Sequence, residues 1–213
     1  MTTFQDSKIA IGVPIGSEHV HWRFMTSLVE LTKPPRHGLI IRQGSLVDAA
    51  RNEIVKMMLD HPAGFTHLFF IDDDMTFPQN TLQRLIEMDV PVASSLCFSR
   101  VPPFRACVFE REDQGKKGFW KRVDFKNEGS KMEVDGTGTG CMLIKREVLE
   151  QIQAPHFAIE WDNGNQRGED LYFMEKLYQA GIPVTLDTTL KIGHMTSATV
   201  ERAPEQDKAH VKL

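Results

Sequence analysis

This chain of 213 residues has few cysteines, no excess of basic residues and no long apolar run. The three cysteines, Cys97, Cys107 and Cys141, are odd in number and show no CxxC spacing, which argues against a disulfide framework. The 25 Lys and Arg residues are outnumbered by 29 Asp and Glu residues, giving a net charge of −4. The basic residues are also scattered rather than arranged in a stripe. We therefore expect reduced, buried thiols and no nucleic acid partner.

The chain also lacks an apolar run of roughly 20 residues, the length that a membrane-spanning helix needs. The apolar run from Lys8 to Ile15 is too short for the core of a signal peptide. We therefore expect no transmembrane segment and a cytoplasmic location. No internal repeat, linker or low-complexity segment divides the sequence, so a single domain is expected.

Strand-like and helix-like patterns alternate along the chain, and 41% of its residues are hydrophobic, which is enough to build a core. The expected strands are 8–15, 39–43, 67–71, 91–98, 141–145 and 183–187, and the expected helices are 17–31, 45–59, 80–86, 146–153 and 168–180. Ser17 and a Ser45–Asp48 capping box are the expected N-terminal signals of the first two helices. This alternation predicts an α/β fold with a mostly parallel central sheet flanked by helices. Its ligand crevice should lie at the carboxyl ends of the strands.

Three consecutive aspartates, Asp72, Asp73 and Asp74, follow the apolar run HLFFI at 67–71. If the chain stays extended, Asp72 and Asp74 point to one side and Asp73 to the other. Crowded carboxylates at a strand end repel one another, and a hard divalent cation such as Mg²⁺ or Mn²⁺ relieves that repulsion. The alternative is a solvated acidic turn that caps the next helix.

The segment FFIDDDMTFP resembles the DxD region of GT-A glycosyltransferases, especially bacterial and phage members similar to glycosyltransferase family two. LVDAARNEIV at 46–55, GTGTGCMLIKREVLE at 136–150 and GEDLYFMEKLYQAGIPV at 168–184 resemble further segments of that family, in the same order. The resemblance runs from about Ile9 to His194. It implies one GT-A, Rossmann-like domain over 1–213, with a nucleotide-sugar-binding half at 1–100, an acceptor half at 101–200 and a polar tail at 201–213.

The resemblance assigns the acidic triplet and one histidine to the donor and its metal ion. Asp72 would contact the ribose or uracil side of the donor, Asp74 would bind the metal with Asp72 in the same set, and Asp73 would assist indirectly. His194, after the last strand, would complete the metal shell, where imidazole suits Mn²⁺ better than Mg²⁺. A lone histidine after a strand is otherwise a structural residue.

The donor nucleotide would also contact the end of the first strand and the second helix. Pro14, Ile15 and Gly16 lie where the family holds the nucleoside base, although an ordinary strand-to-helix turn has the same composition. The family's Arg-Asn pair corresponds to Arg51 and Asn52. Arg51 either pairs with a donor phosphate or is a solvated i,i+4 partner on its helix.

On the acceptor side, the resemblance makes Asp170 the general base of an inverting transfer, with Glu169 as the second candidate. The alternative is that both are first-turn acidic residues that the helix dipole favours. Gly138 and Gly140 would form a backbone-lined acceptor wall, because no P-loop lysine follows them.

Two tryptophans are candidates for stacking on a sugar ring. Trp161 lies in the polar loop EWDNGNQRGED, whose glycines at 164 and 168 also suit a lid, and we expect it to contact the acceptor. For Trp120, in a polar stretch at 115–131 that suits a loop or hairpin, packing is the expected role.

Taken with the resemblance, these patterns predict a metal-dependent, hexosyltransferase-like enzyme of the inverting type. It would use Mn²⁺ or Mg²⁺ and move a sugar from a UDP- or GDP-sugar to a hydroxyl of a carbohydrate, lipid-linked or protein acceptor. A nucleotidyltransferase is one alternative, but VPIGSEHVHW lacks the basic residues that hold a triphosphate. A non-catalytic nucleotide-sugar-binding protein is the other.

Overall fold

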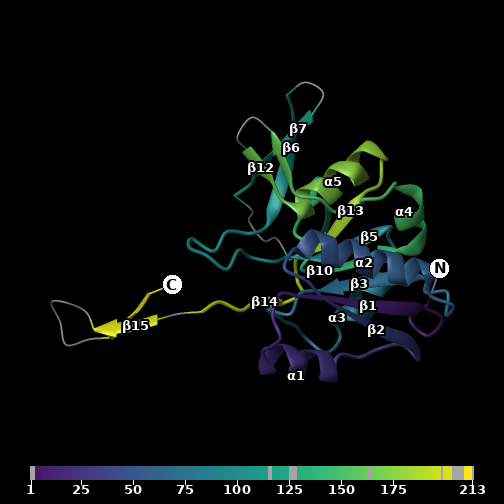
Figure 1. Ribbon diagram of the computed structural model, residues 1–213, viewed down its shortest axis with the longest axis horizontal. Helices are drawn as coiled ribbons and strands as arrows, with labels where there is room; N and C mark the ends of the chain where they lie inside the picture. Colours follow the sequence, from purple (N-terminus) through teal and green to yellow (C-terminus); the bar gives the residue numbers. More distant parts are fainter. Residues whose placement is uncertain are drawn as a thin grey trace.

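A central sheet of seven strands organises the computed structural model, in the order β2-β1-β3-β10-β5-β13-β8 (Figure 1). The structure describes residues 3–114, 117–124, 129–162, 165–197, 199–202 and 209–212. The sheet strands are β1 (Lys8–Ile15), β2 (Arg36–Gln43), β3 (His67–Ile71), β5 (Val92–Ser95), β8 (Lys131–Val134), β10 (Cys141–Lys145) and β13 (Val184–Asp187). The helices are α1 (Trp22–Glu30), α2 (Val47–Asp60), α3 (Thr81–Glu87), α4 (Arg146–Gln151) and α5 (Glu169–Gln179).

Most strands of the central sheet run in one direction. β1 is parallel to both β2 and β3, and β13 is parallel to β5. β10 lies between β3 and β5 and is antiparallel to both, and the edge strand β8 is antiparallel to β13. The predicted α/β fold with a mostly parallel sheet is therefore confirmed.

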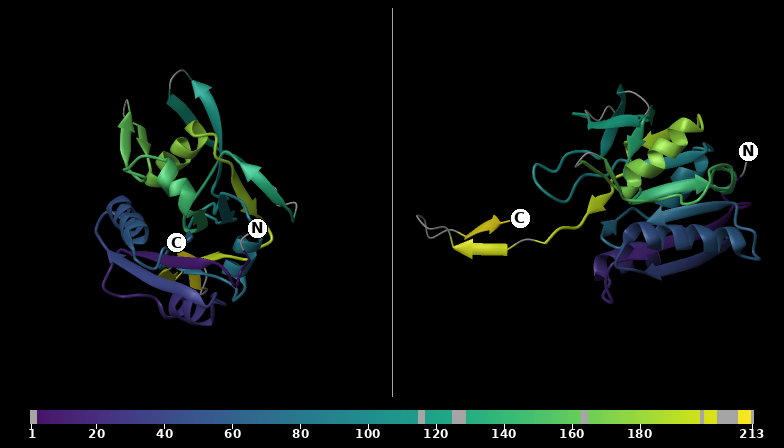
Figure 2. Two further views of the ribbon diagram at one scale, coloured as in Figure 1. Left: turned by 90° about the vertical axis from the view of Figure 1, so that its right-hand side faces the viewer. Right: turned by 45° about the horizontal axis from the view of Figure 1, so that its top comes forward.

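Helices cover both faces of the sheet, and the alternation of side chains along β3 shows why. Leu68 and Phe70 pack into one core with residues of α2, α4 and α5, whereas Phe69 and Ile71 pack into a second core with residues of α1 and α3. Figures 1 and 2 show these helices on opposite sides of the strands. A strand that is buried on both faces is nearly continuous in apolar residues, as the LFFI part of β3 is.

The first two helices begin later than their sequence signals predict. Ser17 bonds to the backbone of His19, and α1 starts after His21, whose Nδ1 accepts a hydrogen bond from the Arg23 amide. The predicted Ser45–Asp48 capping box is also wrong, because α2 starts after Leu46 without a side-chain cap. The end of α5 before Gly181 is confirmed, and this glycine has a φ of 67°.

The second half of the chain adds an antiparallel sheet of β6 (Val108–Gln114), β7 (Lys117–Arg122) and β9 (Gly136–Thr137). Trp120 on β7 packs against Gly136, where a Cβ atom would lie 2.6 Å from the indole ring. The indole Nε1 donates to the buried carboxylate of Glu175 on α5. The packing role predicted for Trp120 is thus confirmed, whereas residues 115–116 and 125–128 of that stretch lie outside the described residues.

Short strand pairs complete the described structure. β14 (Gly193–His194) pairs with β4 (Met75–Thr76), which brings His194 next to the acidic triplet. β11 (Glu160–Asp162) pairs with β12 (Asn165–Arg167). β15 (Thr199–Arg202) pairs with β16 (Ala209–Lys212) in a hairpin that extends away from the rest of the molecule (Figure 1). In the described part of the chain, none of the helices has the length and apolar character needed to cross a bilayer.

The buried His67 at the start of β3 predicts a loss of stability in acid. Burial, reinforced by the charge of Lys145, lowers the pKa of His67 from 6.5 to about 4. The folded protein holds this imidazole neutral. Its contribution to the free energy of unfolding is therefore complete above pH 6.5 and is lost as the pH falls from 6.5 to 4. The shift corresponds to about 3 kcal/mol. Urea unfolding at pH 7 and pH 4.5 should show a smaller pH-dependent loss in His67→Gln than in the wild type. Equal losses would contradict this assignment.

Candidate active site

The carboxyl ends of β1 and β3 and the start of α5 open onto a cavity of about 330 Å³. Most of the residues predicted to form a site line it: Pro14, Ile15, Gly16, Arg51, Asp72, Asp73, Asp74, Glu169, Asp170 and His194. They come from segments far apart in the sequence. The crevice predicted at the strand ends therefore exists and has an acidic lining.

The acidic triplet forms a turn rather than an extended continuation of β3. The Met75 amide donates to the Asp72 carbonyl at 3.1 Å, which closes the turn between β3 and β4. As a result Asp72, Asp73 and Asp74 all line the same cavity. The prediction that Asp73 points to the opposite side is wrong, because the alternation of side chains ends where the strand ends.

Arg51 is the buried cation of the site. Its side chain is 2% exposed, and its Nη2 lies 3.0 and 3.1 Å from the two carboxylate oxygens of Asp72. Its Nε lies 3.8 Å from Glu169. Among the described residues, neither Nε nor Nη1 has a hydrogen-bond partner. The alternative of a solvated surface arginine is therefore wrong, and the guanidinium keeps unused donors beside the cavity.

Burial dominates the electrostatics of the two carboxylates near Arg51. It raises the pKa of Asp72, although the charge of Arg51 opposes this effect. Burial and the neighbouring Asp170 together raise the pKa of Glu169 to about 7. Glu169 is therefore able to exchange a proton near neutral pH, as general acid–base chemistry requires.

Asp170 lies in the first turn of α5 and is held by a residue from the segment before β10. The Oδ1 atom of Asp170 accepts hydrogen bonds from both the amide and the hydroxyl of Thr139, the amide at 3.2 Å. On the same segment, the carbonyl of Gly140 accepts from the Asp72 amide at 3.0 Å. One short segment thus contacts the acidic triplet and the acidic first turn of α5.

Asp74 faces the far side of the cavity, where an imidazole and a guanidinium approach it. His194 Nε2 lies 3.1 Å and Arg100 Nη1 lies 2.8 Å from its Oδ2. Although burial acts to raise it, the hydrogen bond from His194 and the charge of Arg100 hold the pKa of Asp74 below its ordinary value. The same hydrogen bond raises the pKa of His194.

The donor set at Asp74 suits a divalent cation that takes its remaining ligands from a substrate. No group of three or more His, Cys, Asp or Glu side chains in the described residues is arranged to hold a metal ion. Asp72 is engaged by Arg51, so the predicted trio of Asp72, Asp74 and His194 lines one cavity but does not form a three-ligand metal site. However, His194 Nδ1 lies 2.8 Å from the Phe98 carbonyl, the second contact that usually orients a metal-binding imidazole. Mg²⁺ and similar ions are often held by one or two side chains plus substrate phosphates.

Several residues assigned from the sequence do not themselves line this cavity. The carboxamide of Asn52 bonds to the backbone of Asp48, His156 and Phe157, which corrects the expectation that it faces the nucleotide. Trp161 on β11 is 69% exposed. Neither it nor Gly138 or Gly140 lines the cavity. Gly164 lies outside the described residues.

Two residues of the site were missed in the sequence. Arg100 lies in an irregular loop without a motif, so only its contact with Asp74 reveals it. Thr139 lies inside the GTGTG pattern, of which only the glycines are predicted to belong to the site. A hydroxyl between two glycines, next to a predicted strand, was the available signal.

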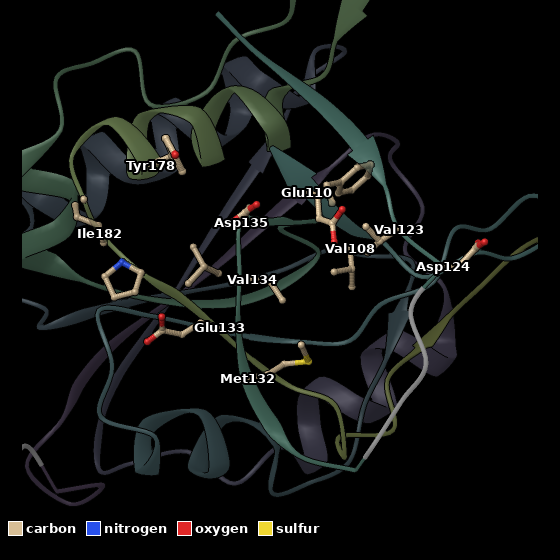
Figure 3. A pocket seen from close by; sticks show the side chains of 14 residues that line it. Val108, Glu110, Val123, Asp124, Met132, Glu133, Val134, Asp135, Tyr178 and Ile182 are labelled. Atoms are coloured by element: carbon tan, nitrogen blue, oxygen red, sulfur yellow. The ribbon is translucent and has the colours of Figure 1, made fainter. Parts of the chain in front are cut away.

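Size does not identify the site. A larger cavity of about 730 Å³ lies between β6, β8 and the end of α5 (Figure 3). Its lining includes Glu110, Glu133, Asp135 and Tyr178 but none of the predicted site residues. Another cavity, of about 960 Å³, adjoins the site on the side of Asp74, Arg100 and His194.

The sheet order, the flanking helices and the acidic strand end define a Rossmann-like fold of the glycosyltransferase type. The crystal structure of A197 from STIV superimposes with a TM-score of 0.61 and 21% identity, covering 97% of this chain and 94% of that one. GalNAc-T7 with UDP, GalNAc and Mn²⁺ gives a TM-score of 0.60 and 13% identity. That match covers 88% of this chain but 44% of the other, so this chain spans less than half of its length. No family model and no curated protein matches the sequence. These likenesses establish the fold.

Because Arg51 is buried and paired, replacing it should lower the stability of the protein strongly and by an amount that depends on pH. Arg51→Met should destabilise the protein by about 3–5 kcal/mol at pH 8, because it removes a buried cation from half-buried carboxylates. The loss should be smaller at pH 5, where Glu169, with a pKa of about 7, is neutral. Urea unfolding at both pH values measures this.

Arg42→Met is the matched control for this substitution. Arg42 is 43% exposed and pairs with Glu53 at 2.7 Å on the surface, so less than about 1 kcal/mol should be lost. Equal effects of the two substitutions would show that Arg51 is not a buried counter-ion.

Proposed function

We propose that this protein is a metal-dependent glycosyltransferase that moves a sugar from a nucleotide-diphosphate sugar to an acceptor hydroxyl. The observation that carries the proposal is the convergence of Asp72–Asp74, Glu169, Asp170 and His194 on one cavity at the strand ends. Ligands of open α/β sheets bind at this edge. The fold shared with GalNAc-T7, which was solved with UDP, GalNAc and Mn²⁺, adds support.

The donor would bind across the near side of this cavity. Pro14, Ile15 and Gly16 would hold the nucleoside base, and Asp72 and Asp73 its ribose side. The unused Nε and Nη1 donors of the buried Arg51 suit an oxygen-rich ligand, since an unsatisfied buried donor is costly until a ligand accepts its hydrogen bonds. A phosphate or a sugar hydroxyl of the donor meets that need.

Asp74 and His194 would hold Mn²⁺ or Mg²⁺, the remaining ligands being donor phosphate oxygens. When bound, the ion would stabilise the negative charge that gathers on the leaving diphosphate. Arg100 now supplies positive charge at Asp74. Because its side chain is on an irregular loop and lines both adjoining cavities, it has room to move to a phosphate.

Asp170 would act as the general base of an inverting transfer. Its Oδ1 is occupied by Thr139, so its Oδ2 is left to take the proton of the acceptor hydroxyl. Glu169 is the second candidate, because its pKa of about 7 suits proton exchange at neutral pH. Gly138, Gly140 and the exposed ring of Trp161 would border an acceptor that is a carbohydrate, a lipid-linked sugar or a protein.

Calorimetric titration with UDP-, GDP- and dTDP-sugars, with Mn²⁺ and with excess chelator, tests the donor and the metal. Asp74→Ala should weaken Mn²⁺-dependent nucleotide binding by more than about 100-fold, because losing a direct ligand costs at least as much as losing a residue that orients one. Asp60→Ala removes the same charge from an exposed pair with Lys56 and should bind normally. Equal binding in chelator, or no binding by the wild type, would overturn the proposal.

Asp170→Asn tests the reaction separately from binding. Asparagine keeps an oxygen for Thr139 but cannot take the acceptor proton. Nucleotide binding should therefore be unchanged, and sugar transfer should fall by about 10²–10⁴-fold. Full activity would refute the assignment of the base. A wild-type protein that binds but never transfers would instead be a non-catalytic nucleotide-sugar-binding protein.

A further inference from the structure

Thr139 is completely buried and lies in the segment between β9 and β10. Its amide and its hydroxyl donate to the same oxygen, Oδ1 of Asp170. A buried threonine needs only one acceptor for its hydroxyl, and a backbone carbonyl would serve. Two donors aimed at one carboxylate oxygen therefore fix that carboxylate as well as satisfying the threonine.

The second oxygen of Asp170 is left beside a residue without a side chain. A Cβ atom on Gly138 would lie 3.6 Å from Oδ2, which is ordinary contact. The terminal torsion of an aspartate is broad, so a carboxylate without such contacts samples many orientations. The contacts of Thr139 therefore hold Oδ1 on its own side and leave Oδ2 free of them, on the side of Gly138.

The same segment also contacts the donor side of the site. The Gly140 carbonyl accepts from the Asp72 amide, and a Cβ atom on Gly140 would lie 3.1 Å from Asp72 Oδ2. Residues 138–140 thus touch the carboxylates on both sides of the cavity. Their backbone sets the separation between Asp72 and Asp170.

We propose that Thr139 is a positioning residue for Asp170, a role that rests on the proposed glycosyltransferase function. In the transfer, the acceptor oxygen forms a bond to the anomeric carbon and its proton passes to Asp170 Oδ2. The bond from that carbon to the diphosphate oxygen breaks, and its electron pair leaves with the diphosphate. Thr139 holds Oδ1, so that Oδ2 meets the acceptor hydroxyl in one orientation.

Steady-state kinetics of Thr139→Val and Thr139→Ser test this role. Valine keeps the shape and the amide contact but removes the hydroxyl, so kcat should fall by about 10- to 100-fold while the donor KM changes less than about twofold. Serine restores the hydroxyl and should recover most of the lost kcat. A residue that only stabilised the fold would not separate kcat from KM in this way.

Thr137→Val is the matched control. Thr137 is equally buried and two residues away, but its hydroxyl donates to the Cys107 carbonyl instead of a site carboxylate. Its loss should lower the melting temperature and leave kcat close to that of the wild type. If Thr137→Val and Thr139→Val lower kcat equally, Thr139 is a structural residue and the inference fails.

The contact itself is measured without any substitution at Thr139. In NMR spectra, the Thr139 amide proton should move upfield in Asp170→Asn, because a neutral oxygen is a weaker acceptor than a carboxylate. An unchanged amide signal, or a Thr139→Val protein with full kcat, overturns the inference alone. A wild-type protein that transfers no sugar from any donor overturns the proposed function, even if the amide signal moves.

Discussion

The ion pair between the buried Arg51 and the half-buried Asp72 is the interaction on which the site depends. Three carboxylates, Asp72, Glu169 and Asp170, act on the charge of this one guanidinium. The pair forms because α2 packs closely on β1, where a Cβ atom on Gly12 would lie 2.6 Å from Ile54. The close approach of helix and strand thus places the Arg51 guanidinium beside carboxylates that would otherwise repel one another.

Much of the fold follows from the sequence, because buried strands and helices have apolar residues at characteristic spacings. The continuous apolar run of β3 and the glycine after α5 predict elements that the structure contains. The start of α1 does not follow, since it depends on whether Ser17 or His21 satisfies a helix amide. A strong capping residue at Ser17 forms a local turn instead, and sequence alone does not rank these two outcomes.

The sequence predicts which residues form the site but not which of them pair with one another. Parallel strands bring their carboxyl ends to one edge, and the family resemblance supplies the order of the motifs. The turn at Asp72–Asp74, however, depends on one hydrogen bond between Met75 and Asp72. The division of partners, with Asp72 at Arg51 and Asp74 at His194, depends on side-chain directions across 21 and 120 residues of sequence. Asn52 lies next to Arg51 on α2 yet turns to the backbone of Phe157.

The buried carboxylate of Glu175 has a mechanical consequence for the site. On α5, five residues after Asp170, it accepts hydrogen bonds from Arg111 on β6 and Trp120 on β7, and Arg167 on β12 lies 3.7 Å away. Two hairpins are therefore fastened to the helix whose first turn reaches the cavity. Removing the Glu175 carboxylate would therefore loosen both hairpins at once from the helix that carries Asp170.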